Sequence, residues 1–265
     1  MKRLFPIVLA ALFGVLTIAT EPRLAHADGG GFPSTPQAGF VQYSDYATYL
    51  RRRPDGLLVE DYATPRSTSM YWNDMARAAG LPSSAFPASN GADYLFSGYR
   101  RHDNVSSYVY TGANGDIYEI YWPGDRWHFG DLLVAAGGAP QPAANTSPVG
   151  FVRGDYVNAV YYLTSNGHVH ELSLSSTTWT HNDLTALFGG MVASTWVNHG
   201  ISVFIRSDLH TMVLYVGADF KIHAYDLSNY PYHPGTWSPM DVSGSATLGN
   251  GSWTNSSAHP TSVWV

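Results

Sequence analysis

The chain contains no cysteine among its 265 residues. A protein without cysteine cannot form disulfide bonds, so a conventional hydrophobic core must hold it together. Charged side chains are also scarce, at 13% of the residues, and the formal net charge is −6. Binding to phosphate backbones needs clustered lysine and arginine, so this composition argues against a nucleic-acid partner.

Aromatic residues, in contrast, are abundant. They make up 14% of the chain and include 18 tyrosines and 8 tryptophans. Such an excess is typical of β-rich proteins, or of proteins whose exposed rings contact a ligand. The length is sufficient for one large domain or two small ones.

The first residues have the features of a targeting segment rather than of a fold. A basic start, an apolar run and the tripeptide "AHA" predict a secretory signal peptide over residues 1–27. A membrane anchor is the alternative, but Pro6 and Gly14 interrupt the apolar run. We therefore expect a secreted, extracellular protein with no membrane attachment after cleavage. Residues 28–38 predict a flexible segment that leads into the fold.

A hairpin pattern recurs four times in the rest of the sequence. Each copy has an apolar strand, a short turn and an alternating strand, as in "YVYTGANGDIYEI" and "VYYLTSNGHVHEL". The turn glycines Gly56, Gly115 and Gly167 are 59 and 52 residues apart. Phe220 takes the glycine position in the last copy, which predicts a different turn there.

Each copy then reaches a tryptophan and the start of a short helix. The repeated tryptophans are Trp72, Trp127, Trp179 and Trp237. Shortly after each one stands an aspartate, which can cap a helical turn by accepting backbone N–H bonds. These aspartates are Asp74, Asp131, Asp183 and Asp241.

The repeat predicts an all-β fold, namely a β-propeller of four to five blades, each of three to four antiparallel strands plus a short helical turn. A two-domain sandwich is the alternative, but it does not predict tryptophan and aspartate recurring in phase. The propeller domain is expected at 39–265, with repeats near 39–82, 93–140, 149–190 and 200–244 and a tail strand at 257–265. The tail strand is predicted to start a fifth blade, to close the ring, or to pair with a second copy in a homo-oligomer.

Glutamates recur four residues after the turn glycines, as Glu60, Glu119 and Glu171, and Ala224 holds this place in the fourth copy. Strand alternation puts each carboxylate on an apolar face that meets the neighbouring blade. A carboxylate in such a place needs hydrogen-bond donors. Either the protein supplies them, or a sugar does, with its hydroxyls on the carboxylate and its C–H face on an indole.

The segment "SYVYTGANGDIYEIYWPGDRWHFG" resembles the repeat of the fucose-binding β-propeller lectins of bacteria and fungi. The other copies are closer to the tachylectin (tectonin)-like propeller repeats of bacteria. In the lectin family, a site between blades combines an arginine, a glutamate and Trp or Tyr rings. The ligand-binding residues that the resemblance implies are Glu60, Glu119, Glu171, Tyr108, Trp122, Trp127 and Trp179.

The family's arginine is missing from its matching position, where Tyr108 stands in the second copy. An arginine is a bidentate donor that tyrosine cannot replace, so the resemblance leaves the sugar open. Other arginines lie near in sequence but away from that position. They are Arg52, Arg101, Arg126 and Arg153.

The histidines raise the alternative of a metal site. "GHVHEL" places His168 and His170 on one face of a strand, and His223 matches His170 in the next copy. Two imidazoles two residues apart can ligate a metal, but no third ligand stands at a useful spacing. We therefore predict no metal and no cofactor. The alternation also predicts that the histidines point outward and the glutamate inward.

The remaining motifs do not indicate catalysis. Neither G-x-S-x-G nor H-E-x-x-H occurs, and capping explains the repeated aspartates. Repeated sites on one ring favour multivalent binding, because several weak contacts then act together. The sequence predicts a non-enzymatic, lectin-like protein whose partners are glycans or glycoconjugates. A protein-interaction or surface scaffold is the second hypothesis, and a secreted hydrolase is the third.

Overall fold

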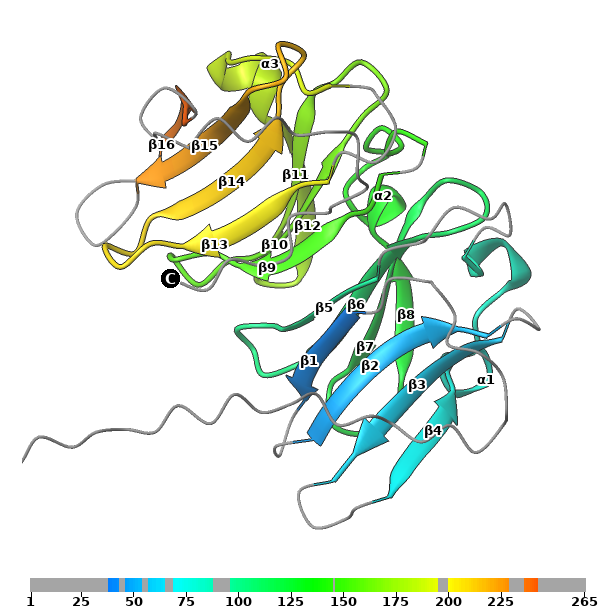
Figure 1. Ribbon diagram of the computed structural model, residues 1–265. Coiled ribbons are helices and arrows are strands. Elements are labelled where there is room, and N and C mark those ends of the chain that lie inside the picture. Colours follow the sequence, from blue (N-terminus) through cyan, green and yellow to red (C-terminus); the bar gives the residue numbers. More distant parts are fainter. Residues whose placement is uncertain are drawn as a thin grey trace, which may run out of the picture. The chain divides into compact units, whose positions relative to one another are not determined.

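The computed structural model describes residues 38–42, 46–53, 57–64, 69–87, 96–144, 146–194, 200–228 and 236–242. The predicted signal peptide, the segment before residue 38 and the tail strand lie outside this part of the chain. In the described part, the strands form four antiparallel sheets of four consecutive strands each (Figure 1). The prediction of an all-β fold is confirmed.

The four sheets, numbered in chain order, have the same strand order. Sheet 1 consists of β1 (Ala38–Gln42), β2 (Tyr46–Arg52), β3 (Leu58–Ala63) and β4 (Met70–Asp74). Sheet 2 consists of β5 (Ser97–Arg100), β6 (Ser106–Thr111), β7 (Ile117–Trp122) and β8 (His128–Asp131). Sheet 3 consists of β9 (Val149–Val152), β10 (Asn158–Leu163), β11 (Val169–Ser175) and β12 (Thr178–Asp183). Sheet 4 consists of β13 (Ser202–Ile205), β14 (Thr211–Val216), β15 (Ile222–Ser228) and β16 (Thr236–Asp241).

Short helices follow the first three sheets directly. They are α1 (Met75–Ala79), α2 (Leu132–Ala135) and α3 (Leu184–Phe188), and a 3₁₀ turn follows α1 at Ser83–Ala85. Each of the three α-helices begins after the predicted aspartate, whose side chain accepts a hydrogen bond from the backbone N–H three residues on, at 2.9–3.0 Å. The capping prediction is therefore confirmed for Asp74, Asp131 and Asp183. None of the helices in the described residues is long and apolar enough to cross a membrane.

The hairpin turn between the second and third strands is the same in sheets 2, 3 and 4. Gly115 and Gly167 adopt left-handed conformations, with φ of 86° and 80°, and Phe220 adopts one too, with φ of 61°. In each turn the backbone N–H of this residue donates to the carbonyl oxygen three residues earlier, at 2.9 Å. The predicted difference at Phe220 is wrong, because the flanking ladder imposes the conformation despite the cost of a side chain in the left-handed region.

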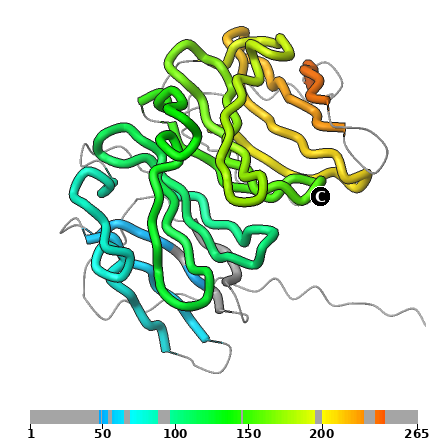
Figure 2. Tube along the Cα trace, turned by 180° about the vertical axis from the view of Figure 1, so that it is seen from behind, coloured from blue at the N-terminus to red at the C-terminus, as the bar shows by residue number. Residues whose placement is uncertain are grey.

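The core lies between neighbouring sheets, because alternate residues of a strand face opposite sides. On β7, Ile117 packs in the cluster shared with sheet 3, while Ile120 packs in the cluster shared with sheet 1. A third cluster joins sheets 3 and 4 and includes Tyr161, Val213 and Trp237. The first strands β1, β5, β9 and β13 contact one another in chain order. Figure 2 shows the sheets from behind, coloured along the chain from blue and cyan in sheet 1 to yellow and orange in sheet 4.

Candidate functional site

Glu60 lies in the core between sheets 1 and 2, only 1% exposed. Thr48 Oγ1 donates to its Oε1 at 2.6 Å, and Asn73 Nδ2 donates to its Oε2 at 3.0 Å. Tyr108 belongs to sheet 2 and donates its hydroxyl to Oε1 at 3.1 Å. Burial raises the pKa of Glu60, against the effect of these three hydrogen bonds. The carboxylate thus joins two sheets and has its donors from the protein.

Glu119 lies on the side of sheet 2 that faces sheet 3 and is also buried. Ser107 Oγ donates to its Oε1, as does Tyr99 OH at 3.4 Å. Arg101 Nη1 donates to Oε2 at 3.4 Å and forms a salt bridge with it. Burial raises the pKa of Glu119, and the positive charge of Arg101 opposes that rise.

Glu171 is fully buried between sheets 3 and 4. Of the three glutamates, it has the fewest hydrogen bonds to its carboxylate oxygens within the part of the chain that the structure describes. Arg153 Nη1 donates to its Oε1 at 3.0 Å. Its Oε2 and the hydroxyl of Tyr161 are buried and make no hydrogen bond of standard geometry in the described residues. Burial raises the pKa of both groups, and the Glu171 carboxylate raises that of Tyr161 further. Tyr161 and Asn182 still lie close enough to lower the pKa of Glu171 against the effect of burial.

Trp237 completes this group from sheet 4. The Arg153 guanidinium lies 5.9 Å from the centroid of the Trp237 ring, within the range of a cation–π contact. The Tyr161 ring meets the same indole edge to face, with centroids 6.0 Å apart. We call Arg153, Tyr161, Glu171 and Trp237 the Arg153 seam. It brings together a carboxylate, a guanidinium, a phenol and an indole.

The arginines that contact Glu119 and Glu171 come from a turn that the sequence analysis missed. In sheets 2, 3 and 4 the first strand is followed by an Arg-x-Asp turn. The three arginines are Arg101, Arg153 and Arg206. Each arginine donates to the aspartate two residues on. Arg153, for example, donates from Nε to Asp155 Oδ1 at 3.0 Å and from Nη2 to Oδ2. The fourth residue of each turn is left-handed, with φ of 65–68°. The recurring Arg-x-Asp at a spacing of about 52 residues was a signal present in the sequence.

The predicted aromatic rings do not all lie between the same two sheets as the glutamate assigned to them. Trp122 and Trp127 pack with Tyr108 in the core between sheets 1 and 2. Glu119 lies on the opposite face of sheet 2, because Trp122 is an odd number of residues away on the same strand. Trp127 therefore lies in the same inter-sheet core as Glu60, not in the one that contains Glu119. By the same rule, Trp179 packs against the core between sheets 2 and 3, where Tyr99 contacts Glu119.

No protein-family model and no curated protein matches this sequence. Among solved structures, similar folds are AofleA from Arthrobotrys oligospora and a lectin from Burkholderia pseudomallei. The TM-scores are 0.55 and 0.54, each at 16% identity, covering 82% and 78% of this chain and 59% and 55% of theirs. Aleuria aurantia lectin in complex with α-methyl-L-fucoside follows at a TM-score of 0.52 and 16% identity, covering 81% of this chain and 64% of that one.

These comparisons define the fold. The resemblance to fucose-lectin propellers is confirmed for the fold, and the described part of this chain has four sheets of that kind. The chain spans less than two thirds of the length of each of these lectins.

Proposed function

We propose that this chain is a secreted, non-enzymatic, lectin-like propeller that binds glycans non-covalently between adjacent sheets. One observation carries the proposal, namely the convergence of Arg153, Glu171 and Trp237 in one seam. These are the three kinds of group that the lectin resemblance associates with a sugar site. Two buried polar atoms there, Glu171 Oε2 and the Tyr161 hydroxyl, make no hydrogen bond of standard geometry in the described residues.

The chemistry of the seam suits a saccharide. A sugar hydroxyl can donate to Glu171 Oε2 and accept from the Tyr161 hydroxyl or the Arg153 guanidinium. The C–H face of a sugar ring can pack on the Trp237 indole. Such groups distinguish a polyhydroxylated ligand from an apolar one, because the ligand supplies hydroxyls to groups that are otherwise unsatisfied.

The seam is closed in this structure, and that sets the expected affinity. Glu171 is inaccessible, and Arg153 covers the Trp237 ring. A sugar that reaches the carboxylate must displace the guanidinium from the ring, although Asp155 holds it. Because this rearrangement consumes binding free energy, we expect weak binding at one seam and a gain from several seams together.

The seam between sheets 2 and 3 has a related set of groups. Arg101 contacts Glu119 and also lies 5.7 Å from the centroid of the Tyr121 ring. Tyr121 is two residues from Glu119 and therefore shares its face of β7. We propose this as the second, weaker site. In the part of the chain that the structure describes, no arginine donates to Glu60, and its three donors come from sheets 1 and 2 themselves.

A glycan array tests this function. The wild type should bind a subset of neutral glycans at millimolar concentration, and Arg153→Gln should reduce binding at least tenfold, roughly the loss of one charged hydrogen bond. Arg206→Gln is the matched control, because Arg206 occupies the same turn of sheet 4 and is half exposed. The double variant Arg153→Gln, Glu171→Gln separates binding from folding, since it removes the buried charge of Glu171 together with that of Arg153 but still lacks the charged guanidinium donor. Equal binding by the wild type and both Arg153 variants would refute this site.

A scaffold function is the second candidate, and the burial of the glutamates favours it. Glu60, Glu119 and Glu171 are at most 2% exposed, and each accepts at least one hydrogen bond from the chain itself. If a folded wild-type protein binds no glycan on the array, the glutamates are structural and the propeller presents a surface to another protein. Export and pairing through the tail strand stay predictions.

A further inference from the structure

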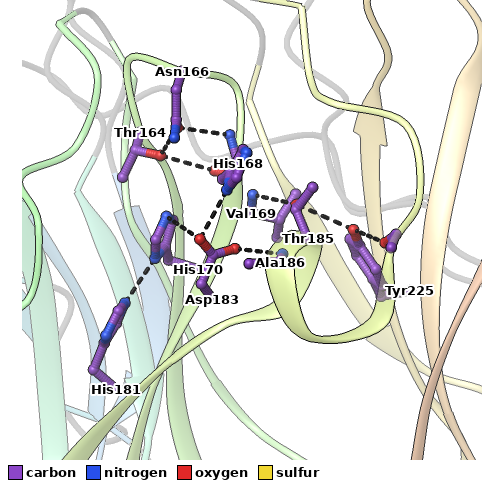
Figure 3. A network of polar contacts seen from close by, with 11 residues as sticks. Thr164, Asn166, His168, Val169, His170, His181, Asp183, Thr185, Ala186 and Tyr225 are labelled. Atoms are coloured by element: carbon purple, nitrogen blue, oxygen red, sulfur yellow. Dashed lines mark hydrogen bonds and ion pairs between the residues drawn. The ribbon is translucent and has the colours of Figure 1, made fainter.

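Four polar side chains gather on one face of sheet 3, where β11 and β12 meet the start of α3 (Figure 3). His168 and His170 are two residues apart and so share a face. The strand register places Asp183 directly opposite His170, and His181 lies two residues before Asp183 on β12. This face of sheet 3 is opposite to the one that carries Glu171.

Three ligand atoms of this group lie close together. Oδ2 of Asp183 accepts a hydrogen bond from Nδ1 of His168 at 2.8 Å, which a metal ion would replace, and it lies 3.7 Å from Nε2 of His170. The atoms of the three residues all lie within 4.8 Å of one another. Tetrahedral zinc sites have metal–ligand bonds of about 2.0–2.2 Å, which puts ligand atoms roughly 3.3 Å apart. The two separations from Asp183 Oδ2, 2.8 and 3.7 Å, lie on either side of that spacing.

The imidazole of His170 points independently to a cation. This side chain is buried, yet its Nε2 has no hydrogen-bond partner in the described residues. Its Nδ1 lies 2.7 Å from Nε2 of His181, and the two rings stack at 4.9 Å. When Nδ1 donates this hydrogen bond, Nε2 carries a lone pair that faces the Asp183 carboxylate. In that tautomer two electron-rich groups face each other, and they repel unless a proton or a metal ion lies between them.

Asp183 divides its two oxygens between separate tasks. Oδ1 accepts from Ala186 N at 2.9 Å and so caps α3. Oδ2 faces His168 and His170 (Figure 3). Capping alone was predicted for Asp183, and no third ligand was predicted beside the histidine pair. The prediction of outward histidines is also wrong for His170, which packs against Tyr162 with centroids 5.3 Å apart.

Sheet 4 offers an internal comparison. Its residues at the places of His168, His170 and Asp183 are Lys221, His223 and Asp241. There Lys221 Nζ lies 3.5 Å from Asp241 Oδ2, so a lysine supplies the positive charge. Sheet 3 has the same carboxylate with a histidine in place of the lysine.

We propose that His168 Nδ1, His170 Nε2 and Asp183 Oδ2 bind a divalent transition-metal ion of the zinc type. His181 accepts the hydrogen bond from His170 Nδ1 and fixes the ring orientation, as outer-shell groups of metal sites do. Water completes the coordination, since His168 and Asp183 are each about one quarter exposed and give access from solvent. Imidazole and carboxylate ligands suit zinc and its neighbours better than calcium or magnesium. The ion clamps β11 to β12 at the start of α3.

Cobalt titration of tag-free, chelator-treated protein tests the site. We expect one equivalent of Co²⁺ to give the visible absorption bands of a four- or five-coordinate site, and Zn²⁺ to abolish them. His168→Ala and Asp183→Asn should remove the bands, and His181→Phe should weaken the affinity about 10- to 100-fold. Asp183→Asn retains the capping oxygen, so circular dichroism should show an intact fold.

His210→Ala is the matched control. His210 also pairs with a carboxylate, with Nδ1 at 2.8 Å from Asp226 Oδ1, and this variant should keep the cobalt spectrum. Binding of less than one equivalent by the wild type would overturn the proposal. A spectrum that survives in both His168→Ala and Asp183→Asn would do so as well.

Discussion

Arg153 lies over the indole of Trp237, so the first turn of sheet 3 covers the repeated tryptophan of sheet 4. The same guanidinium binds Glu171 and Asp155. One side chain thereby connects a buried carboxylate, an aromatic ring and a turn. Any ligand of the Arg153 seam must compete with these contacts, which links the stability of the seam to its binding.

The pairing of Arg153 with Glu171 should be visible in stability. Arg153→Gln leaves Glu171 buried without its cation, and we expect a loss of about 3–5 kcal/mol in the free energy of unfolding. The double variant Arg153→Gln, Glu171→Gln should recover most of this loss. Urea denaturation measures both. Arg206→Gln removes a half-exposed ion pair and should cost less than about 1 kcal/mol. Similar losses in both single variants would contradict the assignment.

A substitution in the turn at Phe220 should increase the stability of the protein. Phe220 is exposed and left-handed, so Phe220→Gly should raise the free energy of unfolding by about 1 kcal/mol. Gly167→Ala should do the opposite, because φ is +80° and the new Cβ would lie 2.6 Å from the carbonyl oxygen of Ala193. Thermal unfolding compares the two. A lower melting temperature for Phe220→Gly would show that the exposed ring makes contacts that outweigh the strain.

Glu60 should make stability depend on pH. Burial raises its pKa above the ordinary carboxyl value, so the folded state holds the proton more tightly than the unfolded state. The resulting stabilisation is present below the unfolded pKa and is lost as the pH rises through the folded pKa. Relative to Glu60→Gln, the wild type should lose about 1.4 kcal/mol for each unit of pKa difference. Urea denaturation from about pH 4 to about pH 7 tests this. A constant difference across this range would mean that Glu60 titrates as in the unfolded chain.

Helix capping provides a local test. Asp131→Ala removes the acceptor for Val134 N at 3.0 Å and should cost about 0.5–2 kcal/mol. Asp131→Asn retains an oxygen at this place and should cost less. Chemical denaturation of the two variants distinguishes the hydrogen bond from the charge. An equal loss in both variants would assign the effect to charge instead.

The sequence predicted which types of residue form the site, but not which of these residues contact one another. The alternation of residues correctly places Glu60, Glu119 and Glu171 on buried faces. It also separates Glu119 from Trp122, although the lectin resemblance alone placed them together. The lectin resemblance places the arginine on the hairpin strand, whereas Arg101 and Arg153 come from the turn before it, 18 residues ahead of Glu119 and Glu171. Linear matching missed them because a side chain from a turn can reach across its sheet.

The sequence by itself determined the repeat, the turns at Gly115 and Gly167 and the capped helix starts, because each depends on residues only a few positions apart. The tertiary structure alone decided which of the repeated groups are covered. Trp72 and Trp237 hold the same place in their repeats, yet Trp72 is 58% exposed and Trp237 is 6% exposed. The physical reason is that burial depends on the neighbouring sheet. In the same way, only the pairing of β11 with β12 brings Asp183 to His168 and His170, since ligands from two strands meet through register and not through spacing along the chain.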